Sequence, residues 1–293
     1  MKTVACLGIA ALCAAAAASS ASSPGGRIVF TRTSAIGTAR IWVMNGNGTG
    51  QRAVTPLRVN DEGAALSRDG RRVAFARRVG GQHDLWVMSL NGSGLRQVAS
   101  GPADQSNPSW SPDGRSIAFA RFLGGRADIW VMRSDGSGQR RLTTSAALED
   151  TPAWSPDGRR IAYARAGRIW VMNANGSGQH ALTRGSAGGV DYAPSWSPDG
   201  RRIAFESTRN EAGRDLTNEI WLMGADGTHL VRLTHNALED NRPIWSPDGQ
   251  WIAYASARPH PGPLHIWAVH PNGRGLHRVS SSRLEEYLPS WSR

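Results

Sequence analysis

The sequence contains almost no lysine and almost no cysteine. Lys2 is the only lysine, and the two cysteines, Cys6 and Cys13, lie within the first 21 residues. The rest of the chain therefore excludes disulfide bonds and thiol catalysis. The sequence also lacks a Gly-x-Ser-x-Gly motif, a His-Glu-x-x-His motif and a phosphate-binding loop, so it shows none of these hydrolase, metalloprotease or nucleotide-binding signatures.

Long hydrophobic runs are missing except at the N-terminus. Lys2 precedes an apolar run from Val4 to Ala18, and the small residues Ser19-Ser20-Ala21 follow. This order is typical of a signal peptide, which we assign to residues 1–21, and the run is too short for a membrane span. Leu12 precedes Cys13 where a lipoprotein signal has a small residue, so a lipid anchor is not favoured. We expect a secreted or periplasmic protein without a membrane span.

Positive charge is abundant and comes from arginine. The formal net charge is +11. Two interpretations stay open: a solvated arginine-rich surface, or attraction to a polyanion such as a cell-wall polymer. We do not expect nucleic-acid binding, because no recognition helix is predicted and the aromatic residues recur at packing positions. We expect a monomer.

One sequence unit recurs through the chain. It reads P-x-W-S-P-D-G-R-x-I-A-F, then a variable stretch, I-W-V-M-N, N-G-S-G and R-x-L-T. The tryptophan of I-W-V-M occurs six times, at Trp42, Trp86, Trp130, Trp170, Trp221 and Trp267. The tryptophan of P-x-W-S occurs at Trp110, Trp154, Trp196, Trp245 and Trp291, with Leu66 in the remaining copy. Each unit predicts four short strands, A to D, separated by Gly, Pro, Asn and Asp turns. Residues 25–293 are therefore predicted to form an all-β, six-bladed β-propeller.

The two ends of the repeat array complement each other. The chain stops at Trp291-Ser292-Arg293, directly after a strand A, and Pro24-Gly25-Gly26-Arg27 matches the turn that follows strand A elsewhere. We expect the C-terminal strand to join the N-terminal blade and close the ring.

The repeats resemble the WD40-like PD40 repeats of the TolB propeller family. The resemblance covers the chain from about Gly25 to Arg293 and rests on W-S-P-D-G at Trp110, Trp154, Trp196 and Trp245, with a Ser-Arg-Asp-Gly variant at Ser67. It implies a six-bladed ring and a protein-binding role in the cell envelope. In TolB proteins, which these repeats resemble, an α/β domain precedes the propeller. We expect no such domain here, which leaves a Tol–Pal role open.

Loop lengths vary in one class of connection. The strand B to strand C spacing ranges from Tyr163–Trp170 to Phe205–Trp221, whereas the other spacings are nearly constant. The B–C and D–A loops emerge on one face of a propeller, which we call the loop face, and we predict that it binds a protein or peptide partner. Drift in exposed loops is the alternative. The longest connection, Ser207 to Asn218, supplies the predicted contacts Arg209, Asn210, Glu211, Arg214 and Asp215.

Acidic residues recur five positions before the strand A tryptophan. They are Asp61, Glu149, Asp191, Asp240 and Glu286, with Gln105 in the remaining copy, and Glu62 and Asp150 add a second acid. We predict a ring of carboxylates at the channel mouth that attracts a basic peptide or a cation, including Ca²⁺, which takes oxygen ligands. The alternative is that each carboxylate pairs with a nearby arginine or caps a turn.

The tryptophans are expected to pack between blades, with Trp251 exposed as an exception. Without a catalytic motif, we predict a non-catalytic binding scaffold with no other cofactor. A hydrolase or lyase with a site in the central channel is the alternative.

Overall fold

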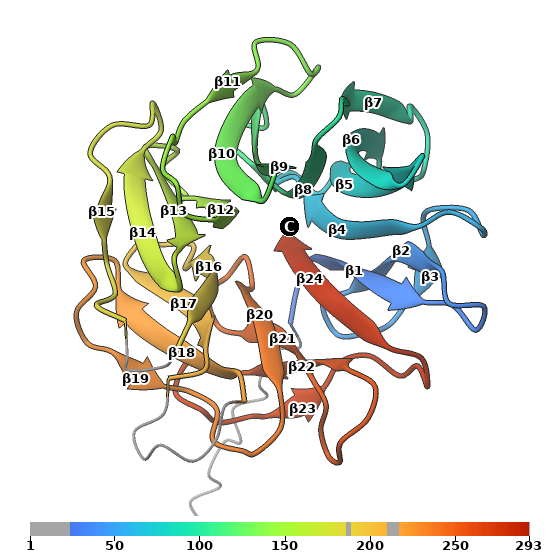
Figure 1. Cartoon of the computed structure of the whole chain (residues 1–293). Coiled ribbons are helices and arrows are strands. Elements are labelled where there is room, and N and C mark those ends of the chain that lie inside the picture. The colour runs from blue at the N-terminus through green and yellow to red at the C-terminus, as the bar shows by residue number, and fades with distance from the viewer. Residues whose placement is uncertain (1–23, 186–188, 210–216, 293) are drawn as a thin grey trace, which may run out of the picture.

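The computed structural model describes residues 24–185, 189–209 and 217–292. They form six four-stranded antiparallel sheets arranged as blades around a central channel (Figure 1). In each sheet the strand order from the channel outwards is A, B, C, D. The predicted all-β, six-bladed propeller is thus confirmed. The predicted signal peptide, 1–21, lies outside the described residues. No helix in the described part of the chain is long and apolar enough to cross a bilayer.

The blades follow one another along the chain, and only the first takes a strand from elsewhere. Blade one consists of β24 (Glu286–Ser292), β1 (Arg27–Thr33), β2 (Ala39–Asn45) and β3 (Arg52–Ala53). Blade two consists of β4 (Asp61–Leu66), β5 (Arg72–Val79), β6 (Gln82–Ser89) and β7 (Arg96–Ala99). Blade three consists of β8 (Asp104–Trp110), β9 (Ser116–Leu123), β10 (Arg126–Arg133) and β11 (Arg140–Arg141).

The second half of the ring repeats this pattern. Blade four consists of β12 (Glu149–Trp154), β13 (Arg160–Arg165), β14 (Arg168–Asn173) and β15 (His180–Ala181). Blade five consists of β16 (Asp191–Trp196), β17 (Arg202–Ser207), β18 (Glu219–Gly224) and β19 (Val231–Arg232). Blade six consists of β20 (Asp240–Trp245), β21 (Ile252–Ser256), β22 (His265–Val269) and β23 (His277–Arg278).

The ring closes through the C-terminal strand, as the sequence predicts. β24 pairs antiparallel with β1, with Trp291 opposite Ile28 and Glu286 opposite Arg32. Ser292 Oγ also donates to the backbone oxygen of Ser67, 2.7 Å away in blade two. The last strand therefore completes blade one and contacts the next blade, which leaves no open sheet edge at the junction.

Six apolar clusters form the core, one at each contact between adjacent blades. The strand A tryptophans belong to these clusters, and Trp110 Nε1 and Trp196 Nε1 each donate to a strand A carbonyl of the preceding blade at 3.1 Å. The prediction that the tryptophans pack between blades is confirmed for them. Trp251 is also buried, because it stacks on His270 at 3.6 Å, so the prediction of its exposure is wrong.

A β-bulge recurs in every strand A. Between two paired positions, strand A contains one residue more than strand B. One bulge residue in each blade has a φ of 49° to 63°: Gly63, Asn107, Thr151, Ala193, Arg242 and Leu288. Glycine adopts this backbone conformation without strain, whereas another residue costs about 1 kcal/mol or more. Five blades thus retain a strained residue at the same point beside the channel.

The W-S-P-D-G motif builds the A–B turn. In blade three, Ser111 Oγ donates to Asp113 Oδ1 at 2.6 Å, and Asp113 also accepts the amide of Arg115 at 3.0 Å. The same Ser–Asp bond recurs at Ser67, Ser155, Ser197 and Ser246. These bonds hold the pKa of Asp113 below its ordinary value. These hydrogen bonds account for the recurrence of the motif. The A–B and C–D turns lie on the face opposite the loop face, which we call the turn face.

Removing residues 288–293 is expected to lower the free energy of unfolding by about 5 kcal/mol or more, because it removes most of β24 together with the buried Trp291. Chemical unfolding followed by tryptophan fluorescence measures the loss. Leu284→Ala, at a residue 39% exposed, is the control and should cost less than about 1 kcal/mol. Unchanged stability of the truncated chain would contradict closure by β24.

Candidate functional site

The five acids predicted at the channel mouth lie inside the blades. Asp61, Glu149, Asp191, Asp240 and Glu286 are all between 0 and 1% exposed. Side chains of a strand stand perpendicular to its sheet, so they point towards neighbouring blades and not through the free edge of strand A into the channel. None of the five lines the central cavity. A role for them in binding Ca²⁺ or a peptide stays a prediction.

Each buried carboxylate lies beside an arginine of its own blade. Arg77 donates to Asp61 through Nε to Oδ1 at 2.6 Å and through Nη2 to Oδ2 at 2.9 Å. The corresponding pairs are Arg32–Glu286, Arg165–Glu149, Arg209–Asp191 and Arg258–Asp240. A buried charge requires such a partner. This geometry favours the ion-pair alternative that the sequence left open.

Four of the five paired arginines also lie over the strand C tryptophan of their blade. The guanidinium of Arg77 is 5.1 Å from the ring centre of Trp86, and that of Arg32 is 4.0 Å from Trp42. In blade three, Arg121 covers Trp130 in the same way, although Gln105 replaces the acid opposite it. The arginine thus joins strands A, B and C within one blade.

The pair in blade four is looser than that in blade two. Arg165 Nε lies 3.4 Å from Glu149 Oε1, and neither carboxylate oxygen of Glu149 has a hydrogen-bond partner among the described residues. Burial raises the pKa of the Glu149 carboxyl above its ordinary value. Arg165 therefore stabilises the charged form of Glu149 less than Arg77 stabilises that of Asp61.

Glu62 and Asp150, by contrast, are partly exposed near the loop face. Each follows a buried acid in strand A. Glu62 Oε1 lies 3.0 Å from His83 Nε2, and Asp150 Oδ1 accepts a hydrogen bond from Asn107 Nδ2 at 2.7 Å. Of the predicted acids, these two remain accessible to a ligand.

The predicted partner loop is described only at its start. Arg209 is bound to Asp191 and to Ser207 Oγ, so its guanidinium serves the blade interior and not the loop surface. Asn210, Glu211, Arg214 and Asp215 lie outside the described residues.

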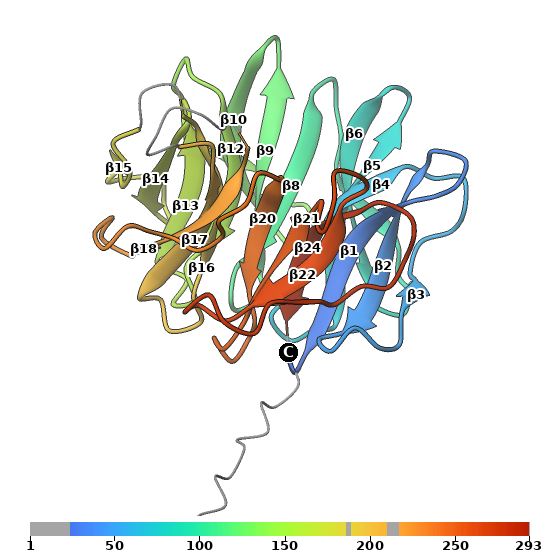
Figure 2. The ribbon, with the colours of Figure 1, turned by 90° about the horizontal axis from the view of Figure 1, so that it is seen from below.

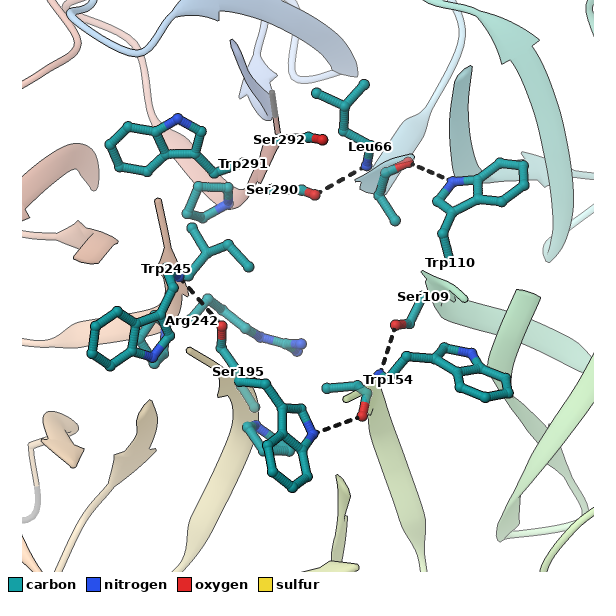
Figure 3. Close-up of a pocket in the computed structure, with 18 of the residues that line it drawn as sticks. Leu66, Ser109, Trp110, Trp154, Ser195, Arg242, Trp245, Ser290, Trp291 and Ser292 are labelled. Carbon is teal, nitrogen blue, oxygen red and sulfur yellow. Dashed lines mark hydrogen bonds between the residues drawn. The ribbon is translucent and has the colours of Figure 1, made fainter. Parts of the chain in front are cut away.

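The central channel encloses a cavity of about 310 Å³ (Figure 3). Its wall consists of the six A strands and is rich in proline, alanine, serine and tryptophan. Ser109, Ser195 and Ser290 each accept a backbone amide of the following blade, at 3.0 to 3.4 Å. Prolines fit this free strand edge, since they have no amide hydrogen to leave unpaired. The wall is thus rigid and largely apolar.

Arg68 and Arg242 are the charged residues among the described residues that line this cavity. Arg242 occupies the strained bulge position of blade six, and its side chain runs into the channel (Figure 3). Its Nη1 donates to Asn107 Oδ1 of blade three at 3.3 Å, and its backbone amide donates to Glu206 Oε2 at 2.6 Å. Arg242 therefore brings a guanidinium to the cavity wall, next to the buried Glu206 carboxylate.

The sequence analysis missed Arg242, although the repeat alignment contains a signal for it. Two positions after each strand A acid, or Gln105, the other copies have Gly63, Asn107, Thr151, Ala193 and Leu288, all uncharged. Glu206 likewise stands at the strand B position where other blades have alanine, as in Ala76 and Ala164. A charged residue at a repeat position that is uncharged in the other copies is the signal that could have identified both residues.

The described wall of the cavity is poor in titratable side chains. Within the described ranges, no three His, Cys, Asp or Glu side chains come together to hold a metal ion. The described residues of the wall include no histidine and no carboxylate. What the wall provides is a confined apolar surface, hydroxyl groups and guanidinium donors, which suit binding of an extended or anionic group.

Comparison with known proteins places this geometry in context. Residues 14–188 and 185–293 match the TolB beta propeller domain family. No curated protein matches the sequence. TolB from Acinetobacter baumannii has a similar structure, with a TM-score of 0.78 and 19% identity over 91% of this chain, which spans 66% of that protein. A protein assigned as TolB from Agrobacterium tumefaciens matches with a TM-score of 0.68 and 22% identity, over 92% of this chain and 99% of that one.

An enzyme is also among the similar structures. An oligogalacturonate lyase in complex with manganese matches with a TM-score of 0.62 and 14% identity, over 88% of this chain and 75% of the lyase. At such identities, the structural likeness shows the fold alone.

Asp61→Asn is expected to lower the free energy of unfolding by about 3 kcal/mol, because Arg77 keeps its buried position and loses its counter-charge. Urea unfolding at neutral pH measures the change. The adjacent Glu62→Gln is the matched control, and it should cost less than about 1 kcal/mol because Glu62 is partly solvated. Equal losses of unfolding free energy in the two variants would contradict a large contribution of the buried Asp61–Arg77 pair to stability.

Glu149→Gln should change stability in a pH-dependent way. The folded-state pKa of Glu149 is raised, so its contribution to stability is fully present below its unfolded-state pKa, near 4.5, and is lost as pH rises through the folded value. Unfolding of both proteins at pH 4.5 and pH 8 should therefore show the variant gaining relative to the wild type at the higher pH. A difference that does not depend on pH would mean that Glu149 titrates normally.

Proposed function

Since the chain belongs to the TolB β-propeller family, we propose that it is a non-catalytic binding scaffold, secreted or periplasmic, that holds a protein partner on its loop face. TolB proteins of similar structure make a scaffold role the natural expectation. The lyase similarity suggests the alternative of a catalytic channel, but a described wall without histidine or carboxylate favours binding.

Exposed apolar side chains on the loop face carry this proposal. The B–C connection of blade one presents Ile36, and the ends of β5 and β9 present Val79 and Leu123. The D–A connections present Leu57, Leu148, Val190 and Leu284. The exposed fraction reaches 68% for Ile36 and 61% for Leu57. Clusters of large apolar residues that remain in water are typical of binding surfaces. Fewer such residues lie towards the opposite face, among them Leu95 and Leu276.

The shape of the loop face supports the same interpretation. The B–C hairpins of blades two and three have eight-residue strands, β5 and β6, β9 and β10, whereas those of blades four and five have six-residue strands. The longer hairpins rise beside the channel (Figure 2). A partner on this face therefore meets a raised wall on one side and the channel entrance beside it.

A photo-crosslinking amino acid at Leu148 or Leu57 is expected to give a discrete covalent adduct with one protein in the cell envelope, identified by mass spectrometry. The same amino acid at Leu95, which is exposed to a similar extent (41% against 48% for Leu148), is the matched control and should give none. Adducts from Leu95 alone would place binding on the turn face. No adduct at any position would contradict a protein-binding scaffold.

A further inference from the structure

The junction of blades four and five on the turn face differs from the first three junctions. In blades one to three, an arginine of strand D donates to the C–D turn of the next blade: Arg52 to the Leu90 carbonyl, Arg96 to that of Ser134, and Arg140 to those of Ala174 and Asn175. These bonds are 2.8 to 3.3 Å long. A guanidinium therefore occupies the space between the two blades at each of these junctions.

His180 stands at this strand D position in blade four. An imidazole is shorter than an arginine side chain, and among the described residues no side-chain hydrogen bond joins His180 to the next blade. An open cavity of about 580 Å³ remains there, between β15 and the turn that follows β18 (Figure 1). Its wall includes His180 and Arg160 from blade four and Arg201, Asp226 and His229 from blade five.

A second departure from the repeat supplies the histidine of blade five. The last residue of the C–D turn is glycine in the other five blades, with a φ of 63° to 70°, whereas blade five has His229 at a φ of 52°. Five positions earlier, only blade five has a glycine, Gly224, where a Cβ atom would lie 2.7 Å from Asp226 Oδ1. The glycine and the side chain are thus exchanged between the two ends of this turn. Because a residue other than glycine is strained at such a φ, the exchange costs stability and brings an imidazole to the cavity.

The protein orients both imidazoles through one ring nitrogen. His180 Nδ1 donates to the Gly178 carbonyl at 2.9 Å, and His229 Nδ1 lies 2.7 Å from Thr228 Oγ1. Neither Nε2 forms a hydrogen bond within the described part of the chain, so this nitrogen is available to a ligand. Because Nδ1 of His180 already carries a proton, a proton on its Nε2 makes the ring an imidazolium, which an adjacent anion stabilises.

The two arginines of the wall are also available to a ligand. The Arg160 guanidinium lies 4.6 Å from the ring centre of Trp196, which holds it beside the cavity. Arg72, its counterpart in blade two, donates to the Gly114 carbonyl at 2.7 Å, whereas Arg160 makes no such bond to the described residues. Arg201 is exposed on the A–B turn of blade five. Neither Arg160 nor Arg201 has a carboxylate of the described residues within ion-pair distance.

The carboxylates near the cavity are bound within their own turns. Asp226, in the wall, accepts the hydroxyl and the amide of Thr228, and these bonds hold the pKa of Asp226 below its ordinary value. Asp157 and Asp199, in the adjacent A–B turns, accept serine hydroxyls, and each has a second arginine beside it in addition to the one in the wall. The wall therefore carries two guanidinium groups against one carboxylate, and protonation of the imidazoles adds to this excess.

We propose that this cavity binds a tetrahedral oxyanion, a sulfate or a phosphate group. The donors come from β13, from β15 and from two turns of blade five, so they approach a ligand from several directions. A tetrahedral anion offers oxygens in all these directions, whereas a carboxylate holds its two oxygens in one plane. The site lies on the turn face, opposite the proposed partner surface, and it does not depend on the scaffold function.

The test is an NMR titration of the whole protein with sodium sulfate at pH 6 and constant ionic strength. Sulfate keeps both charges at this pH, and an ordinary imidazole is then mostly protonated. The backbone ¹⁵N–¹H resonances of Gly224 and Ala225, which line the cavity, report binding. Sodium acetate, inorganic phosphate and glycerol 1-phosphate are the comparison probes.

Sulfate is expected to shift both resonances to saturation. Arg201→Gln should weaken its binding by about tenfold, the effect of losing a hydrogen bond to a charged group. Arg115→Gln, at the same turn position of blade three, is the matched control and should bind like the wild type. His229→Gly should also weaken binding, and it should fold at least as stably as the wild type because glycine adopts this φ without strain.

The variant His180→Arg separates a shaped site from general attraction to positive charge. It adds a charge, but the new guanidinium should bind the Ala225 carbonyl as Arg96 binds that of Ser134, and it should fill the cavity. Sulfate binding should therefore weaken although the net charge rises. Stronger binding in this variant would mean that charge alone attracts the anion, and would overturn the proposal.

Other results would also overturn it: no saturable shift in the wild type, unchanged binding in both Arg201→Gln and His229→Gly, or an equal loss in Arg115→Gln. Acetate binding as tightly as sulfate would contradict a tetrahedral ligand. Tighter binding of glycerol 1-phosphate than of inorganic phosphate would support the site and identify an ester on a larger molecule as its ligand. The reverse order would support the site with the free ion as its ligand.

Discussion

The direction of side chains in a strand governs this structure. They stand perpendicular to the sheet, and every sheet of the ring turns both faces towards other blades. The acid that begins strand A is therefore directed into the blade, where an arginine of strand B or its end meets it. In most blades the same guanidinium covers the strand C tryptophan, so one side chain connects three of the four strands. Arginine suits this position because it stays charged and its planar group both pairs and stacks.

The same constraint limits which residues determine the chemistry of the channel. Along most of strand A, side chains point away from the channel, and the free backbone edge faces it. The bulge interrupts this pattern and brings one residue per blade to the channel end near the loop face. In five blades that residue is uncharged, and in blade six it is Arg242. A single substitution in one repeat thus places a guanidinium at this end of the channel.

The two faces of the ring follow different physical requirements. The turn face is built from Ser–Asp bonds that hold the A–B turns in one conformation, which leaves little freedom of length. The B–C loops on the other face share no such bond among the described residues. They vary in length, and the loop face presents apolar side chains such as Ile36 and Leu123. Because neighbouring blades are held by six separate apolar clusters and by β24, the loops can differ without loss of the ring.

The sequence by itself determined the architecture. The period of the tryptophans predicted six blades, the matching ends predicted closure by the last strand, and the turn motif predicted the A–B hairpins, because each depends on local or repeated patterns. It located the acids of strand A as a repeated feature but could not decide where they point. Burial of Asp61 beside Arg77, and of Trp251 against His270, follows from contacts between strands and turns that a linear pattern does not contain. The tertiary structure alone brought Arg242 of blade six to Asn107 of blade three, since residues 135 positions apart meet only when the ring is closed.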